Sequence, residues 1–183
     1  MAVDLPCMAC EQRLKLPIAG CHGSEPMPWH ALNVYDGAFR QLLLQLKRLP
    51  TKPGLAALIN RLAGTLQIAS SSVLVPVPSW KTKRGNPLPA TIATGLGPPV
   101  RHLLRRSRTS VGQHRLSRQQ RLENLKGAFQ STSSTPQRQV WIVDDILTTG
   151  ATAVSAKVGL ERAGHEVLGI ICLGRTPAQR NRR

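Results

Sequence analysis

The sequence predicts an α/β fold in which a parallel sheet is flanked by helices and preceded by a small N-terminal cysteine knuckle. Three observations predict it. From residue 72 onward, short apolar runs of strand type alternate with segments of helical spacing. Residues 1–30 instead hold three of the four cysteines and several prolines. The length of 183 residues and the apolar content of 41% suffice for one domain with a full core and a small appendage.

The N-terminal cysteines indicate half of a tetrahedral zinc site. A Cys-x-x-Cys pair lets two thiolates on one tight turn face the same ion. A second such pair beginning at Cys21 would end on Ser24, a poor zinc ligand, so a histidine must complete a Cys3His set. His30 is one candidate, and the set that we predict is Cys7, Cys10, Cys21 and His22. The alternatives are a remnant site that no longer closes or a redox-active pair.

Two helices are expected between residues 31 and 70. The first begins after Asp36 and stops at Pro50. The second covers residues 54–69. Each has leucine and isoleucine at helical spacing on one face, as for ordinary packing: Leu42, Leu43 and Leu46, then Leu55, Leu58, Ile59, Leu62 and Leu66.

Strands and helices alternate in the remainder of the chain. Strands are predicted at residues 73–77, 141–145 and 166–174, and helices at 87–96 and 151–164. This order predicts a parallel sheet with a ligand crevice at the carboxyl ends of its strands. Two polar segments interrupt the pattern, the arginine-rich residues 101–126 and the connector 131–139. Cys172 lies within an apolar strand and is expected to be a core residue.

The charge of the chain predicts a polyanionic partner. Lys and Arg number 25 against 9 Asp and Glu, which gives a net charge of +16. Between Asp36 and Glu123 there are 15 basic residues and no acidic one. With only 3% aromatic residues, binding would proceed through phosphates rather than stacked bases. A generally basic, solubilising surface is the alternative.

Two adjacent carboxylates mark the predicted crevice. Asp144 and Asp145 follow an apolar strand, where a cation or vicinal sugar hydroxyls could share them. Residues 148–152, Thr-Thr-Gly-Ala-Thr, supply hydroxyl donors and a glycine turn before a helix N-terminus, a combination that suits a phosphate. Together they indicate a ribose 5-phosphate site. The alternative is an ordinary strand and helix, with solvated aspartates and Thr152 as the cap.

This pattern resembles the phosphoribosyl-pyrophosphate (PRPP) motif of type I phosphoribosyltransferases. The resemblance narrows to the ComF competence-protein family, also called GntX-like. The stretches that carry it are the N-terminal cysteines, YDGAFRQLLLQLK, VLVPVPSWKTKRGN, RRSRTSVGQHRLSRQQRLENLKGAF, VDDILTTGATA and AGHEVLGIICLGR. The implied fold is a type I phosphoribosyltransferase-like sheet.

The resemblance implies a role for each motif position. Asp144 and Asp145 would hold the ribose hydroxyls directly or through Mg²⁺. The 5-phosphate would be bound by Thr148, Thr149, Gly150, Ala151 and Thr152. The turn 78–86 would be the pyrophosphate loop, with Lys81, Lys83, Arg84 and Gly85. A basic flap within residues 101–126 would cover the site and contact nucleic acid through Arg105, Arg106, Arg108, Gln113, Arg115, Arg118 and Arg121.

Two functions are compatible with this resemblance. The first is a competence factor that assists the uptake of internalised single-stranded DNA in natural transformation and senses or holds PRPP or a related ligand. Competence helicase and recombination proteins would then be its partners. The second is an active phosphoribosyltransferase, a pentosyl transferase that moves phosphoribose from PRPP to a base or other nucleophile and releases pyrophosphate. The aspartates serve both functions equally, and a basic scaffold with a degenerate site is the third possibility.

The expected organisation follows the motifs. Residues 1–30 form the knuckle, 31–70 a helical segment, 71–177 the phosphoribosyltransferase-like domain with the flap 101–126, and 178–183 a basic tail. No apolar run reaches the roughly 18 to 20 residues of a membrane span, and the N-terminus lacks signal-peptide features. We therefore expect a cytoplasmic protein that acts at the inner face of the membrane.

Overall fold

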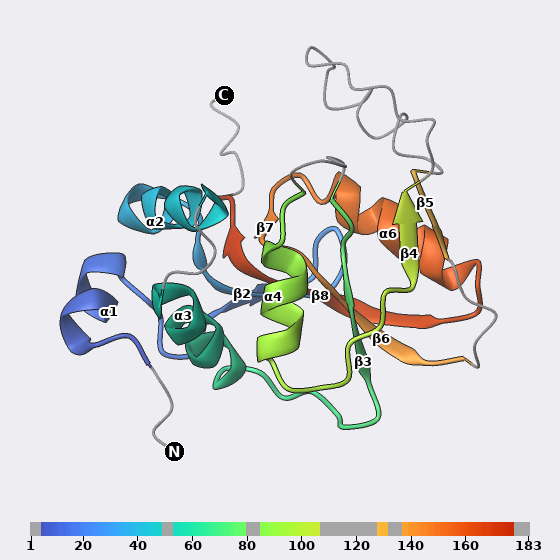
Figure 1. Ribbon diagram of the computed structural model, residues 1–183, viewed down its shortest axis with the longest axis horizontal. Coiled ribbons are helices and arrows are strands. Elements are labelled where there is room, and N and C mark those ends of the chain that lie inside the picture. Colours follow the sequence, from blue (N-terminus) through green and yellow to red (C-terminus); the bar gives the residue numbers. More distant parts are fainter. Residues whose placement is uncertain (1–4, 49–52, 80–84, 107–127, 132–136, 178–183) are drawn as a thin grey trace, which may run out of the picture.

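The computed structural model describes residues 5–48, 53–79, 85–106, 128–131 and 137–177. One sheet organises these residues, with strand order β1-β2-β8-β6-β3 and with β7 also paired to β8 (Figure 1). Its strands are β1 Cys21–Gly23, β2 Trp29–Val34, β3 Val73–Pro76, β6 Gln139–Val143, β7 Ile146–Leu147 and β8 Glu166–Arg175. All neighbours are parallel except β1 and β2. The predicted α/β class with a parallel sheet flanked by helices is confirmed.

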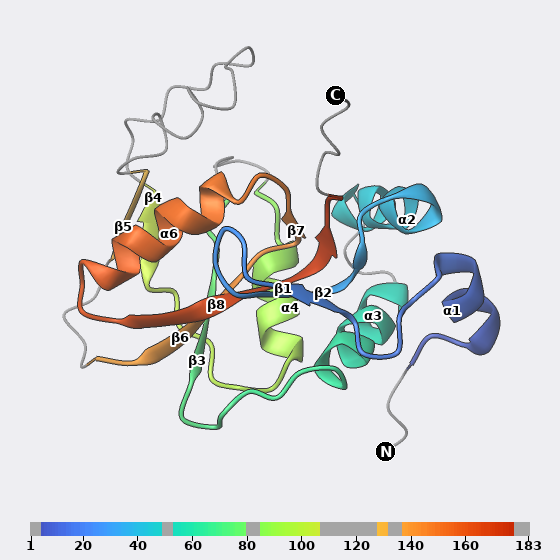
Figure 2. The same cartoon turned by 180° about the vertical axis from the view of Figure 1, so that it is seen from behind.

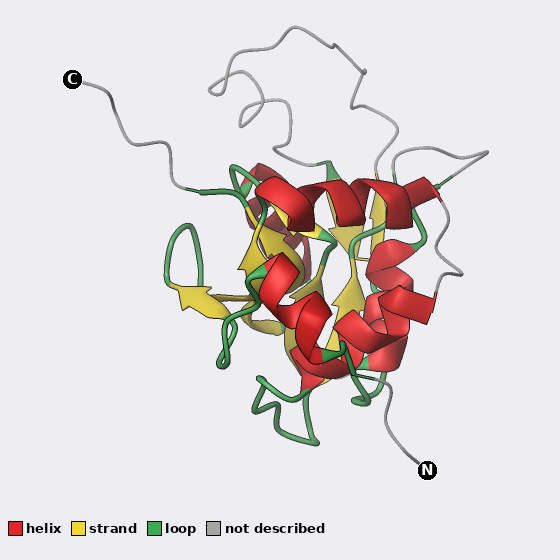
Figure 3. Cartoon of the chain, turned by 90° about the vertical axis from the view of Figure 1, so that its left-hand side faces the viewer, coloured by secondary structure: helices red, strands yellow, loops and turns green. Residues whose placement is uncertain are grey.

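Helices cover both faces of this sheet. The helices α2 Gly37–Arg48, α3 Pro53–Ala63 and α4 Leu88–Gly95 pack on one face, and α6 Ala151–Glu161 packs on the other (Figures 1 and 2). The short helix α1 Met8–Leu14 lies beside α2. In the view from the side of α1, α2 and α3, these helices stand in front of the strands (Figure 3).

Side-chain alternation along the strands builds two separate cores. In β6 and β8, Ile142 and Ile170 point into the core beneath α6, whereas Val143 and Ile171 point into the core beneath α2, α3 and α4. Successive side chains of a strand face opposite sides of its sheet. Each face of the sheet therefore has its own set of apolar residues, as expected for parallel strands buried on both sides.

The open edge of β3 is covered by the chain that follows α4. The Leu74 N–H donates to the Pro99 carbonyl at 2.8 Å, and the Arg101 N–H donates to the Leu74 carbonyl at 2.9 Å. All four residues of β3 are buried. The chain then continues into a small antiparallel pair, β4 Leu104–Arg106 and β5 Phe129–Ser131, which packs against α6.

Most predicted helices and strands are present, with two corrections. No helix or strand was predicted in residues 1–30, yet this segment forms α1 and β1 and begins β2, which pairs with β8 inside the main sheet. The predicted helix 54–69 is too long, because α3 ends at Ala63 and Leu66 packs from the loop beyond it. The domain boundaries remain a prediction.

Candidate functional site

Asp144 and Asp145 lie between β6 and β7, in line with the neighbouring strand. The pairing of β6 with β8 ends at Val143 opposite Ile171, and β7 resumes it with Ile146 opposite Gly174. The register is unchanged across the two aspartates. The sequence placed them at the end of a strand, and the structure places them in a short interruption of one.

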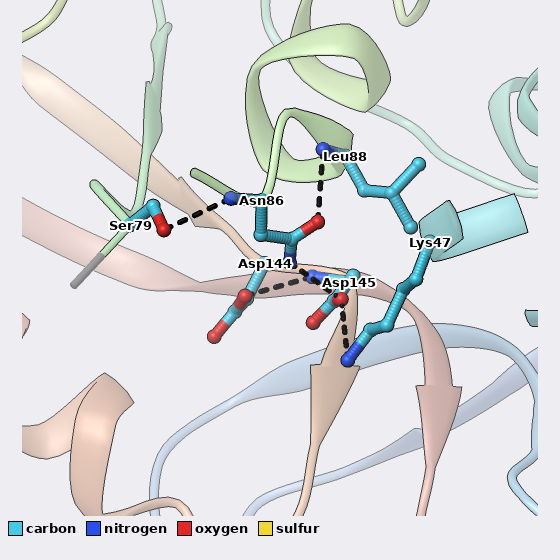
Figure 4. A network of polar contacts seen from close by, with 6 residues as sticks. All are labelled: Lys47, Ser79, Asn86, Leu88, Asp144 and Asp145. Carbon is cyan, nitrogen blue, oxygen red and sulfur yellow. Dashed lines mark hydrogen bonds and ion pairs between the residues drawn. The ribbon is translucent and has the colours of Figure 1, made fainter. Parts of the chain in front are cut away.

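Asp145 is the centre of a polar network (Figure 4). Its Oδ2 accepts a hydrogen bond from Asn86 Nδ2 at 2.7 Å and forms an ion pair with Lys47 Nζ at 2.8 Å. The Asn86 Oδ1 accepts the Leu88 N–H at 3.2 Å, and the Asn86 N–H donates to Ser79 Oγ at 2.9 Å. Asp145 is only 5% exposed, so its charge is stabilised by these partners rather than by water.

Asp144 has different surroundings. Its Oδ1 accepts the Asp145 N–H at 2.8 Å, and within the described part of the chain it forms no ion pair. Burial, with the neighbouring charge of Asp145 as the second cause, raises the pKa of Asp144 to about 8. Binding of a cation or of a pair of hydroxyl groups beside Asp144 would therefore stabilise its ionised form.

A cavity of about 400 Å³ opens at these carboxylates. Arg106 lies on its wall and is held in place, because its Nε donates to the Pro78 carbonyl at 3.0 Å and its guanidinium carbon lies 4.6 Å from the centre of the Phe129 ring. Burial lowers the pKa of Arg106, and the charge of Asp144 opposes this shift. The described lining residues are Lys47, Val77, Pro78, Ser79, Gly85, Asn86, Pro89, Arg106, Asp144, Asp145 and Thr152.

The predicted phosphate loop leads from β7 into α6. Thr148 and Thr149 are exposed, Gly150 precedes the first residue of α6, and Thr152 lines the cavity. Gly150 has φ +79°, a conformation that favours glycine, and a Cβ there would lie 2.3 Å from Pro26 Cγ. The Ala151 N–H points to Thr149 Oγ1 at 3.4 Å. Of residues 148–152, Thr152 thus lines the cavity with the two aspartates, and phosphate binding by this loop stays a prediction.

Sequence analysis missed three residues of this region: Lys47, Asn86 and Arg175. Lys47 and Asn86 bind Asp145, as described above. The Arg175 Nη1 donates to the carbonyls of Leu147 and Thr148, and its guanidinium carbon lies 5.4 Å from the centre of the Trp29 ring. The sequence contains only an indirect indication of these three residues. Lys47 and Arg175 end two of the stretches that carry the family resemblance, and Asn86 ends the predicted pyrophosphate loop.

The remaining predicted residues have different outcomes. Gly85 lies at the cavity, and Arg105 is exposed on β4. Several predicted positions lie outside the described residues: Lys81, Lys83 and Arg84 of the pyrophosphate loop, and Arg108, Gln113, Arg115, Arg118 and Arg121 of the flap. Their roles stay predictions.

The predicted zinc ligands do not form one cluster. Cys7 and Cys10 are both exposed. Hydrogen bonds from the backbone and thiol of Cys10 lower the pKa of Cys7, so the two side chains are neighbours. Cys21 and His22 lie on β1, where the His22 ring stacks 5.8 Å from that of His30. The described residues, which include all four predicted ligands, contain no group of three or more His, Cys, Asp or Glu placed to bind a metal ion. Zinc binding by these residues stays a prediction.

Comparison with known proteins identifies the relatives of this chain. The DNA utilization protein YhgH of Salmonella typhi is 29% identical over 191 residues, which cover 94% of this chain and 79% of that protein. Competence protein F of Haemophilus influenzae is 29% identical over 122 residues, covering 61% of this chain and 53% of that protein. This chain is a homologue of YhgH and competence protein F. The predicted resemblance to the ComF competence-protein family is confirmed.

A further sequence relative and a solved structure also match parts of this chain. YhgH of Escherichia coli strain K12 is 39% identical to this chain over 71 residues, which cover 39% of this chain and 31% of that protein. An adenine phosphoribosyltransferase of Leishmania tarentolae aligns in structure with a TM-score of 0.44 and 22% identity, over 71% of this chain and 62% of that chain. No protein-family model matches.

Proposed function

We propose that this protein is a ComF-type DNA utilization factor whose cavity binds a phosphoribosyl ligand of the PRPP class. One observation carries the proposal: Asp144, Arg106 and Thr152 come from different parts of the chain and line one cavity of about 400 Å³. A carboxylate, a guanidinium and a helix N-terminus beside a hydroxyl are the groups that bind sugar hydroxyls, a diphosphate and a 5-phosphate, respectively.

Magnesium and PRPP fit these groups. Within the described residues Asp144 has no ion-pair partner, so it can accept ribose hydroxyls or a hydrated Mg²⁺. Residues 148–152 would hold the 5-phosphate, and Arg106 with the turn at Gly85 would face the pyrophosphate. When bound, Mg²⁺ would supply charge neutralisation for the pyrophosphate oxygens.

The names of the relatives support the wider role. They are called DNA utilization protein and Competence protein F, which agrees with the net charge of +16 and with a partner rich in phosphates. We propose single-stranded DNA entering the cytoplasm as that partner, with competence helicase and recombination proteins as neighbours at the inner face of the membrane. None of the described helices has the length and hydropathy of a membrane span.

An active phosphoribosyltransferase is the second candidate, because the cavity places Arg106 beside Asp144. In that reaction the bond from the anomeric carbon to the pyrophosphate oxygen breaks, pyrophosphate leaves with the electron pair, and a nucleophile forms the new bond and loses its proton. The aspartates would serve binding and transfer alike. Release of pyrophosphate therefore distinguishes the two candidates.

Calorimetric titration with PRPP in the presence of Mg²⁺ tests the site. We expect the wild-type protein to bind and Asp144→Asn to bind at least about tenfold more weakly, a loss of about 1.4 kcal/mol. Asp36→Asn, which removes an exposed carboxylate and keeps a good helix cap, is the control and should bind like wild type. Absence of wild-type binding, or equal binding by Asp144→Asn, would overturn the proposal.

A further inference from the structure

The two aspartates line one cavity but have different partners. Val143 packs beneath α2 and α4 and Ile142 beneath α6, and the register with β8 continues unchanged from Val143 to Ile146. Asp145 contacts Lys47 of α2 and Asn86 of the turn before α4, whereas Asp144 interacts with the charge of Arg106. Adjacent identical residues thus meet different elements.

One oxygen of the Asp145 side chain is held by two protein donors. This oxygen, Oδ2, receives both the Lys47 ammonium group at 2.8 Å and the Asn86 amide at 2.7 Å. The Leu88 N–H occupies Asn86 Oδ1, which turns the Nδ2 group toward Asp145 (Figure 4). The Asp145 side chain is 8% exposed and that of Lys47 is 34% exposed, so the acid is the buried member of the pair.

The backbone of Asp145 is fixed as well. Its carbonyl accepts the N–H groups of both Leu173 and Gly174 at 3.1 Å. This residue therefore joins the end of α2, the turn before α4 and strand β8. Removal of one partner would leave a buried carboxylate short of a donor, which is more costly than loss of an exposed ion pair.

We propose that Lys47 and Asn86 are positioning residues that hold Asp145 as a structural anchor, so that Asp144 is the acid that meets the ligand. This inference rests on the proposed phosphoribosyl site and divides the roles of the two aspartates, which the sequence motif treats as equivalent. The Asp145 N–H donates to Asp144 Oδ1 at 2.8 Å, so the anchor sets the orientation of the ligand acid directly. Helix α2 is thereby coupled to the occupancy of the cavity.

A double-mutant cycle separates this role from direct contact of Lys47 with the ligand. Because Lys47 also lines the cavity, it could bind a phosphate itself. If Lys47 acts through Asp145, Lys47→Met weakens PRPP binding in the wild-type background and has no further effect in the Asp145→Asn background. If Lys47 binds the ligand, the same substitution weakens binding equally in both backgrounds, and the proposal is wrong.

The expected effects are measured by calorimetry with Mg²⁺ and PRPP. Lys47→Met should weaken binding about tenfold, and Lys47→Arg, which keeps the charge, should bind within about threefold of wild type. Lys157→Met is the matched control, since Lys157 forms an exposed pair with Glu161 at 3.5 Å on α6. It should leave the affinity unchanged.

Urea unfolding of the same variants keeps the inference testable if the wild-type protein binds no PRPP. That result would reject the phosphoribosyl ligand, while the anchor still predicts that Lys47→Met lowers the urea midpoint only where Asp145 is present. A midpoint shift of the same size in the Asp145→Asn background, or no shift in either, would reject the anchor.

Discussion

At the scale of the residue, Asp144 and Asp145 show that the surroundings of two identical side chains give them different chemical properties. Asp145 has a cation and an amide on one oxygen, whereas Asp144 has a backbone N–H and the charge of its neighbour. The pKa of Asp144 rises to about 8 because desolvation, and then the neighbouring charge of Asp145, disfavour its ionised form. Ionisation of Asp144 is therefore disfavoured in the free protein, and a cation or hydroxyl pair bound beside it would stabilise the ionised form.

This proton predicts a pH dependence of stability. The folded pKa of Asp144 lies above the value of 3.8 for an unperturbed aspartate, so the folded state binds a proton that the unfolded state has released. Stability is then lost as pH rises from about 4 to about 8. Asp144→Asn lacks this group, so its stability relative to wild type should increase across that range.

Urea midpoints of wild type and Asp144→Asn between pH 4 and pH 8 measure this effect. The gap between the two proteins should be smallest near pH 4 and widen toward pH 8. Asp36→Asn controls for the loss of one negative charge and should give a flat difference. A constant gap for Asp144→Asn would show that the carboxyl is ionised throughout.

The sequence reveals these acids and not their partners. A strand followed by two acids, threonines and glycine is a local pattern, so Asp144, Asp145 and residues 148–152 could be predicted within one stretch. Asn86 is 59 residues from Asp145 along the chain, and Lys47 is more distant still. Such contacts arise from tertiary packing of α2 and α4 on the sheet, and no spacing rule encodes them.

At the scale of the element, the N-terminal segment is the main surprise. β2, with the sequence WHALNV, interrupts its apolar residues with His30 and Asn33, and it lacks the strict apolar–polar alternation that predicts a strand. Its pairing with β8 makes it a strand, a tertiary effect that overrides local propensity. The helices α2 and α4 were predictable because their apolar stripes and flanking prolines are local features.

The contact between the N-terminal turn and the phosphate loop predicts a stability effect. Gly150→Ala places a Cβ 2.3 Å from Pro26 Cγ at a φ of +79°. Left-handed strain costs about 1 to 2 kcal/mol, and the clash adds roughly 1 to 3 kcal/mol. We therefore expect a large decrease in the free energy of unfolding from urea titration, together with weaker PRPP binding.

Gly97→Ala is the matched control for this substitution. Gly97 has φ +100° and no atom within 4 Å of an added Cβ, so it reports the backbone strain alone. The difference between the two variants measures the contact with Pro26. Equal losses would mean that Pro26 moves aside without cost.

At the scale of the whole molecule, the question is which part of the positively charged surface contacts DNA. Arg106 is occupied inside the cavity wall, whereas Arg105, its neighbour on β4, is exposed. The adjoining sequence from residue 108 to 121 adds four more arginines and no acid. We therefore place the proposed contact with single-stranded DNA on the outer face of β4.

Arg105→Ala tests this placement. It should lower the affinity for a single-stranded oligonucleotide and reduce the slope of log K against log salt by about 0.7, the value for one phosphate contact. Arg162→Ala, which removes an exposed charge at the end of α6, is the control of equal net charge. If both variants change the slope equally, DNA is attracted by the overall charge of the protein, and β4 is not the specific contact surface.

The position of β2 has a practical consequence for dissection of the protein. A fragment that begins at residue 71 contains the whole PRPP-like motif, yet it lacks the strand beside β8 and the lysine beside Asp145. In this fragment β8 would have unpaired backbone N–H and C=O groups along one edge, which favours self-association. The smallest portion of this chain suited to expression and crystallisation therefore starts ahead of Trp29, and the motif cannot be grafted onto another scaffold without α2.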